Sequence, residues 1–298
     1  MRQTRVVVVG SANMDLVGTA PALPRPGETL LGTDFVMVPG GKGANQAVAA
    51  ARAGASCAFL GAIGSDSFGV TLRARITAAG VDTGQLRTTY GTSGVALVMV
   101  NAEGENAILV SPGANASMTG LTEPELTAVR GADVLLAQLE IPVATVTEAA
   151  VVARAAGTRV VLNAAPAVPV PPELLAATDL LVVNETEAQA LTGRGRDEPS
   201  ALLDLAPRAV LTLGADGAWY GDRDGTAVHV PAVKVDVVDS TAAGDAFTAA
   251  LAVAWGEGRD VVDAVRWAAA AGAACARRLG ASVALPTRAE IDELYVPG

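Results

Sequence analysis

Residues 237–245, which read VVDSTAAGD, combine the side chains best suited to chemistry in this chain. A β-rich run precedes them at 232–238, and a long apolar helical pattern follows from about Ala243 to Trp255. Free N–H groups at a helix start favour an anion, and small side chains let a phosphate approach the backbone. We therefore interpret Asp245 as a general base beside a phosphoryl group in transfer. An acid that only stabilises the helix N-terminus is the alternative.

Composition narrows the classes of function. A formal net charge of −10 argues against a nucleic-acid partner. The single histidine, His229, nearly excludes a histidine-based triad, and Cys57 and Cys275 lie in apolar contexts without metal spacing, as expected of reduced core residues. The sequence has neither an apolar run of membrane-spanning length nor a signal-peptide pattern, so we expect a cytoplasmic protein.

Strand and helix patterns alternate along most of the chain. Strands are expected at 6–10, 56–63, 133–138, 159–163, 179–184 and 209–213, and helices at 43–53, 68–79, 143–156 and 185–191. This order predicts a three-layer α/β/α domain whose mainly parallel sheet is covered on both faces. Ligands of such sheets bind at the carboxyl ends of the strands, where the marked loops of this chain also fall.

Two segments, at about 16–39 and 88–110, break this alternation with strand-like pieces and turns. The second contains a hairpin turn at 101–106. We interpret both as a small β-sheet lid inserted into a single α/β domain that spans residues 1–298. Edge strands of the main sheet are the alternative.

Two motifs suit a sugar. In residues 10–15, GSANMD, the side chains of Asn13 and Asp15 point the same way in an extended chain and could bind a polyol, although both are also common in turns. Residues 39–46, PGGKGANQ, differ from a nucleotide phosphate loop because no Ser or Thr follows the lysine. We interpret them as a sugar-binding loop whose glycines let the backbone approach a ligand that Asn45 faces.

Three further loops have both a functional and a structural interpretation. Glu140 could reach a bound sugar, or cap the following helix that Pro142 starts. Asn184 and Glu187 share a helix face and could hold Mg²⁺ through water, but they also have the form of a capping box. Residues 212–217, TLGADG, could contact the phosphates or ribose of a nucleotide, or form an ordinary tight turn.

Together these motifs resemble the ribokinase family of carbohydrate kinases. GSANMD, PGGKGANQA, NETE, TLGADG and VVDSTAAGDAF occur in the order and approximate spacing of that family, over essentially the whole chain. The resemblance implies that Asp245 deprotonates the 5-hydroxyl of D-ribose, which then accepts the γ-phosphoryl group of ATP. It also implies a Mg²⁺ ion with ATP, activation by K⁺ or another monovalent cation, and a homodimer formed through the lid.

The resemblance also assigns site residues, motif by motif. It assigns the sugar to Asn13, Met14, Asp15, Gly41, Lys42, Gly43, Asn45 and Glu140, and the anion hole to the N–H groups of Ala242, Ala243 and Gly244. It places the nucleotide and its Mg²⁺ along Asn184, Glu187, Thr212, Leu213, Gly214, Ala215, Asp216, Gly217, Gly244 and Ala269. It assigns the monovalent cation to Asp239, Thr241 and groups near Cys275, Arg278, Gly280 and Ala284. Relatives often carry a polar residue or histidine where this chain has Ala269, and a serine near Ala284.

Other functions stay open at this point. A kinase of the same family could act on deoxyribose, fructose or adenosine, although the paired glycines before Lys42 and Asn45 favour a small pentose. An inactive sugar-binding protein is disfavoured because Asp245 and the preceding AAG are intact. A dinucleotide-dependent oxidoreductase is disfavoured because no G-x-G-x-x-G turn follows the first strand.

Overall fold

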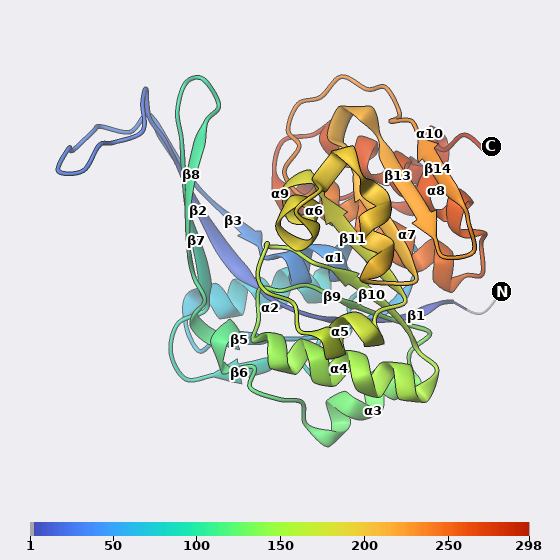
Figure 1. The fold of residues 1–298 in the computed structure, drawn as a ribbon. Coiled ribbons are helices and arrows are strands. Elements are labelled where there is room, and N and C mark those ends of the chain that lie inside the picture. Colours follow the sequence, from blue (N-terminus) through green and yellow to red (C-terminus); the bar gives the residue numbers. More distant parts are fainter. Residues whose placement is uncertain (1–2, 298) are drawn as a thin grey trace.

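The computed structural model describes residues 3–297 and contains a large sheet, a smaller sheet that stands away from it, and covering helices (Figure 1). The strands of the large sheet lie in the order β14-β13-β12-β11-β10-β9-β1-β4. Six pair in parallel: β1 (Arg5–Val9), β4 (Ser56–Leu60), β9 (Val134–Ala137), β10 (Arg159–Asn163), β11 (Leu180–Asn184) and β12 (Arg208–Thr212). Two antiparallel strands extend one edge: β13 (Ala218–Asp222) and β14 (Ala227–Val230).

Helices cover both faces of this sheet because its strands are apolar on both sides. In β1, for example, Val6 and Val8 belong to one buried cluster, while Val7 and Val9 belong to the other. The first cluster includes residues of α1 (Lys42–Arg52), α2 (Ser67–Ala78), α7 (Ala243–Gly256), α8 (Val261–Ala276), α9 (Ala281–Ala284) and α10 (Arg288–Leu294). The second includes residues of α3 (Glu123–Gly131), α4 (Val143–Ala156), α5 (Pro172–Ala177) and α6 (Glu185–Thr192). The predicted three-layer α/β/α architecture is confirmed.

The smaller sheet has the order β3-β2-β7-β8 and projects from the body of the molecule (Figure 1). Its strands are β2 (Asn13–Thr19), β3 (Asp34–Gly40), β7 (Gly94–Val100) and β8 (Asn106–Ser111). The predicted separate sheet is therefore confirmed, and the alternative of edge strands is wrong. Its first strand begins at Asn13, earlier than expected, and Thr88 lies instead in β6 (Arg87–Thr89), which pairs with β5 (Ala62–Gly64).

Two predicted strands are wrong, whereas the other predicted strands and helices lie within one residue of their expected bounds. The segment 56–63 is two strands, because the chain leaves the large sheet at Gly61 and continues as β5 beside β6. The run 232–238 is irregular. The amides of Val238 and Asp239 both donate to Ala276 O, at 2.8 and 3.2 Å, so the end of α8 rather than a strand anchors this segment.

The marked loops lie at the carboxyl ends of the parallel strands. From β1, the sheet continues to β4 on one side and to β9, β10, β11 and β12 on the other. The strand order reverses between β1 and β9, and ligands of open α/β sheets bind outside such a point.

Within the described residues, no helix is long and apolar enough to cross a membrane.

Candidate active site

The first turn of α7 carries the proposed base. Ala242 precedes the helix with φ 61°, the one non-glycine residue with positive φ in the described chain. This conformation turns the Ala243 amide back to Ser240 O at 3.1 Å, so one of the three amides predicted for the anion hole already has an acceptor. The Gly244 amide has no acceptor among residues 3–297, as expected in the first turn of a helix.

Asp245 lies in the same turn and is only 8% exposed. Asn45 Nδ2 donates to its Oδ2 at 3.0 Å, and Gln46 Nε2 donates to its Oδ1 at 2.9 Å. Both donors come from α1, which packs against α7. Burial raises the pKa of Asp245, and the opposing effects of Lys42 and of the two amides reduce that rise. The site thus holds a buried carboxylate that two amide donors orient and whose pKa is raised above its usual value.

The two residues predicted to bind a polyol, Asn13 and Asp15, lie on β2, and their side chains point to the same face of this strand. Asn13 Oδ1 accepts from Asn115 Nδ2 at 2.7 Å, which fixes that amide. The Asp15 carboxylate makes no hydrogen bond to a described residue, and a Cβ at Gly40 on the neighbouring strand would lie 2.2 Å from its Oδ2. Burial, together with Glu140 and Asp245, raises the pKa of Asp15 to about 7, although Lys42 opposes the rise.

The glycines of the predicted sugar-binding loop pack closely against protein backbone. At Gly41, whose φ is 89°, a Cβ would lie 2.7 Å from Asn13 N, and at Gly43 it would lie 2.5 Å from Ser11 N. These contacts explain why glycine is required at both positions, whereas our interpretation that the loop backbone approaches a ligand stays a prediction. They bring the start of α1 against residues 10–13, and so place Lys42 and Asn45 beside the site.

Met14, which the family resemblance assigned to the sugar, is 3% exposed and lies in the core cluster that includes α1 and α7. Its side chain packs in the core, whereas Asn13 and Asp15 on either side of it point to the opposite face of β2. The alternation of β2 thus separates a packing residue from its two polar neighbours.

Glu140 caps a helix, but not the next one. Its Oε2 accepts from the backbone amide of Lys42 at 3.0 Å and from Ser11 Oγ at 2.5 Å. Lys42 begins α1, so this carboxylate satisfies a free amide of a helix that is distant in sequence. The alternative in which Glu140 caps the helix after Pro142 is wrong. The observed contact fixes Glu140 beside Asp15, which its charge affects.

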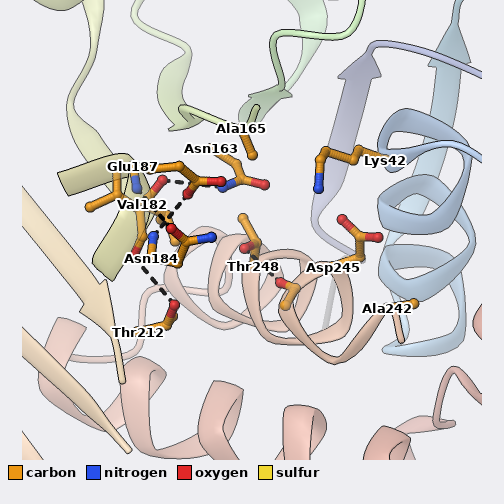
Figure 2. Close-up of a pocket in the computed structure, with 12 residues that line it drawn as sticks. Lys42, Asn163, Ala165, Val182, Asn184, Glu187, Thr212, Ala242, Asp245 and Thr248 are labelled. Atoms are coloured by element: carbon orange, nitrogen blue, oxygen red, sulfur yellow. Dashed lines mark hydrogen bonds between the residues drawn. The ribbon is translucent and has the colours of Figure 1, made fainter. Parts of the chain in front are cut away.

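A cavity lies next to Asp245 (Figure 2). Its lining residues are Lys42, Asn163, Ala165, Val182, Val183, Asn184, Glu187, Thr212, Ala242, Gly244, Asp245 and Thr248. In Figure 2 the Lys42 ammonium and the Asp245 carboxylate face the same space, with Asn163 and Glu187 on its other side. Burial disfavours the charge of Lys42, but the carboxylates of Asp245, Glu140, Glu187 and Asp15 raise its pKa overall. Lys42 is therefore a fixed cation at this cavity.

Asn184 and Glu187 form the capping box that was one of two interpretations. Asn184 Oδ1 accepts from the Glu187 amide at 2.8 Å, and Glu187 Oε2 accepts from the Asn184 amide at 2.8 Å. Burial raises the pKa of Glu187 despite this bond. The second carboxylate oxygen remains available, so the cap does not exclude a water-mediated contact to a metal. Among residues 3–297, no three or more His, Cys, Asp or Glu side chains are arranged to hold a metal.

Residues 212–217, which the resemblance assigned to the nucleotide, form the tight turn that was the alternative interpretation. Thr212 ends β12 and lines the cavity, whereas the turn after it contains Gly214 and Gly217 at φ 55° and 94°. Asp216 in this turn forms an ion pair with Arg196 at 2.5 Å. Ala269 lies half-buried in α8. The structure thus brings Thr212 to the cavity, while Leu213, Gly214, Ala215, Asp216, Gly217 and Ala269 lie outside its lining.

The residues predicted for a monovalent cation form one hydrogen-bonded cluster. Asp239 Oδ1 accepts from the amide and hydroxyl of Thr241, at 2.9 and 2.6 Å, and Asp239 Oδ2 accepts from the Gly280 amide at 2.9 Å. Cys275 Sγ donates to Thr241 O at 3.7 Å, and the Arg278 amide donates to Cys275 O at 3.2 Å. Burial disfavours the charge of Asp239, but its donors hold the pKa below the usual value.

Ala284 is the remaining residue of that prediction. It lies in α9, is 1% exposed, and belongs to the core cluster on the α7 face. Its methyl group therefore packs in the core and offers no oxygen ligand.

Four buried amide residues near the site were not predicted. Gln46, Gln138, Asn163 and Asn115 are each at most 8% exposed and bond to one another or to predicted residues. A signal was available, because Gln138 and Asn163 end strands and Gln46 directly follows Asn45. Local sequence could not reveal which groups they bond.

Residues 3–288 match the family model described as pfkB family carbohydrate kinase. The chain is 39% identical to the ribokinase of Haemophilus influenzae over 98% of each chain, and 39% identical to that of Bacillus subtilis over 97% of this chain and 98% of the relative. The structure of Arabidopsis thaliana ribokinase complexed with ribose and ATP matches with a TM-score of 0.92, at 32% identity over 99% of both chains. The chain therefore belongs to the pfkB family of carbohydrate kinases, and the oxidoreductase alternative is excluded.

Proposed function

We propose that this protein is an ATP-dependent ribose kinase that transfers the γ-phosphoryl group to the 5-hydroxyl of D-ribose. The observation that carries the proposal is the position of Asp245. Its carboxylate lines the cavity that Lys42 and Glu187 also line, accepts a hydrogen bond from Asn45, and acts on the pKa of Asp15 on β2. A sugar hydroxyl on one side and a phosphoryl group on the other would meet there. The similarity to ribokinases supports ribose as the substrate.

Several polar groups would bind the sugar. The Asp15 carboxylate has no donor among residues 3–297, which suits it to accept from sugar hydroxyls. Asn45 donates to Asp245 and keeps a buried Oδ1 without a partner, so that oxygen is available to a hydroxyl. Glu140 anchors the start of α1 with one oxygen and faces Asp15. Alignment of the 5-hydroxyl by these groups would supply much of the rate enhancement.

Phosphoryl transfer chiefly requires alignment and neutralisation of spreading negative charge. Asp245 orients the sugar hydroxyl and accepts its proton as the oxygen attacks the γ-phosphorus, while the bond from that phosphorus to the bridging oxygen breaks and ADP leaves. Lys42 and the free amide of Gly244 stabilise the charge on the transferred group. Asn184 and Glu187 would contact the Mg²⁺ of the nucleotide through water, and that ion would neutralise phosphate charge.

A monovalent cation would lie against Asp239 and the carbonyl of Thr241. The support is the low pKa of a carboxylate that stays charged, three residues before the anion-binding turn at Ala242. Such a cation would strengthen the positive potential at the start of α7. Backbone groups at Cys275, Arg278 and Gly280 lie in the same cluster.

The lid would form a homodimer contact. Cross-strand neighbours share one face of a sheet, so the register of β2 with β3 and β7 separates the lid into two faces. The face opposite Asp15 carries apolar side chains that are 43–66% exposed: Phe35, Met37, Leu97, Met99 and Leu109. An apolar face of this kind is typical of an association surface. A cytoplasmic location, where ATP is available, stays part of the proposal.

A coupled assay of ADP release against a panel of pentoses, hexoses and nucleosides tests the activity. We expect the highest kcat/KM with D-ribose and a product phosphorylated on the 5-hydroxyl. Turnover with none of these acceptors would refute a kinase, and preference for a hexose or nucleoside would refute the ribose assignment.

A further inference from the structure

Three buried amide side chains lie behind Asp245, on the side of its carboxylate that Gln46 contacts. Gln46 and Gln138 are 0% exposed and Asn163 is 8% exposed. They come from three elements: Gln46 from α1, Gln138 from the residue after β9, and Asn163 from the end of β10. Burying three amides in this way is unfavourable unless their hydrogen bonds are made.

Their hydrogen bonds form one directed chain. Asn163 Nδ2 donates to the backbone oxygen of Val182 at 3.2 Å. Gln46 Nε2 donates both to Asn163 Oδ1 at 3.0 Å and to Asp245 Oδ1 at 2.9 Å. Gln138 Nε2 donates to Gln46 Oε1 at 2.5 Å. Donation therefore runs from Gln138, directly after β9, to Gln46, where it branches to the Asp245 carboxylate on α7 and, through Asn163, to the backbone of β11.

This arrangement leaves the Gln46 amide one orientation. A flipped Gln46 would turn its oxygen toward two acceptors, Asp245 Oδ1 and Asn163 Oδ1, and its NH₂ group toward the donor of Gln138. Val182 O fixes Asn163 in turn, because a backbone carbonyl can only accept. Gln138 Oε1 has no donor among the described residues, so the contribution of Gln138 to the chain is its donor end.

The close packing around Gln138 supports the same arrangement. A Cβ at Gly10 would lie 2.0 Å from Gln138 Oε1 and 2.9 Å from the Cα of Gly43. Gly10 thus allows Gln138 and the start of α1 to approach each other between β1 and β9. The glycine at the end of the first strand is required by this contact, since any side chain there would displace either Gln138 or α1.

We propose that Gln46, held by Gln138 and Asn163, is a positioning residue that keeps Asp245 ionised and directs its carboxylate toward the sugar hydroxyl. This inference rests on the proposed function of Asp245 as the base. A neutral N–H donor favours the charged form of a buried carboxylate and holds one oxygen in place. The other charged or titratable groups that act on Asp245 are Lys42, Glu140, Asp15, Glu187 and Cys275.

Replacement of Gln46 by methionine tests the inference, because methionine keeps the approximate volume and removes the donor. The carboxylate loses a hydrogen bond that favours its charged form, so the acid limb of the pH–rate profile should move upward by about one to two pH units. At pH values on the acid limb of the wild-type profile, we therefore expect kcat with ribose to fall about ten- to a hundredfold, because below its pKa the ionised fraction of a base falls tenfold when that pKa rises by about one pH unit. The deficit should shrink toward pH 9, while KM for ribose stays near the wild-type value. Gln138→Met should displace the acid limb in the same direction by less.

Gln85→Met is the matched control, since Gln85 is half-buried in the turn before β6, outside the site. It should leave kcat and its pH profile unchanged. A loss of kcat in Gln46→Met that is equal at every pH would overturn the inference, because it would indicate only a packing role. If Gln46→Met does not fold, an unchanged profile in Gln138→Met has the same meaning. Wild-type protein without ribose phosphorylation, or full activity of Asp245→Asn, would instead refute the proposed function.

Discussion

Replacing Asp245 by asparagine removes the proposed base and little else. The two side chains have nearly the same size, but the carboxylate accepts from Asn45 at one oxygen and from Gln46 at the other. Asparagine has one oxygen, so one of these donors would face an NH₂ group. A buried donor without an acceptor costs about 1–3 kcal/mol, which the removal of a buried charge partly offsets. We therefore expect a folded variant with a slightly lower Tm.

The effect on catalysis should be much larger. Loss of a general base lowers the rate by about 10²–10⁴-fold, which corresponds to about 2.7–5.4 kcal/mol in the activation free energy. A coupled assay of ADP release would measure kcat, and calorimetry would measure ribose binding, which should change little. Asp236→Asn is the control, since Asp236 is exposed in the segment that leads to α7. A kcat close to the wild-type value in Asp245→Asn would refute the role of Asp245.

Three further predictions concern the sugar, the cation and the lid. Because the pKa of Asp15 is raised to about 7, the ionised fraction of this carboxyl increases from pH 6 to pH 8, and KM for ribose should fall over this range. The same pH dependence of KM in Asp15→Asn would contradict this prediction. Replacing K⁺ by choline should lower kcat in the wild type but not in Asp239→Asn; equal wild-type rates in both salts would exclude the cation site. Leu109 is 66% exposed on the lid, so Leu109→Glu should convert a dimer into a monomer in sedimentation velocity, and an unchanged mass would argue against that interface.

The elements that surround the site could be predicted because their signals are local. Strands β10 and β11 are short apolar runs between polar turns, a pattern that the sequence alone shows. Helix α4 has the bounds that the sequence predicts. The strand predicted at 232–238 is absent because a local signal does not show which segment lies beside it. Its composition suits a strand, but Val237 and Val238 are 66% and 61% exposed, and the amide of Val238 bonds to the end of α8. Composition records the preference of a residue, not whether a neighbouring strand is present to pair with it.

The sequence by itself determined that small residues precede Asp245 at a helix start, and that polar loops follow the parallel strands. Those features depend on residues close in the chain. Only the tertiary structure decided which groups hold that carboxylate. The donors of Asp245 lie on α1, Gln46 is oriented from β9 and β10, and Glu140 caps α1 rather than its own helix. Contacts between residues that are far apart in sequence depend on how helices and sheet pack, so no local spacing could have predicted them.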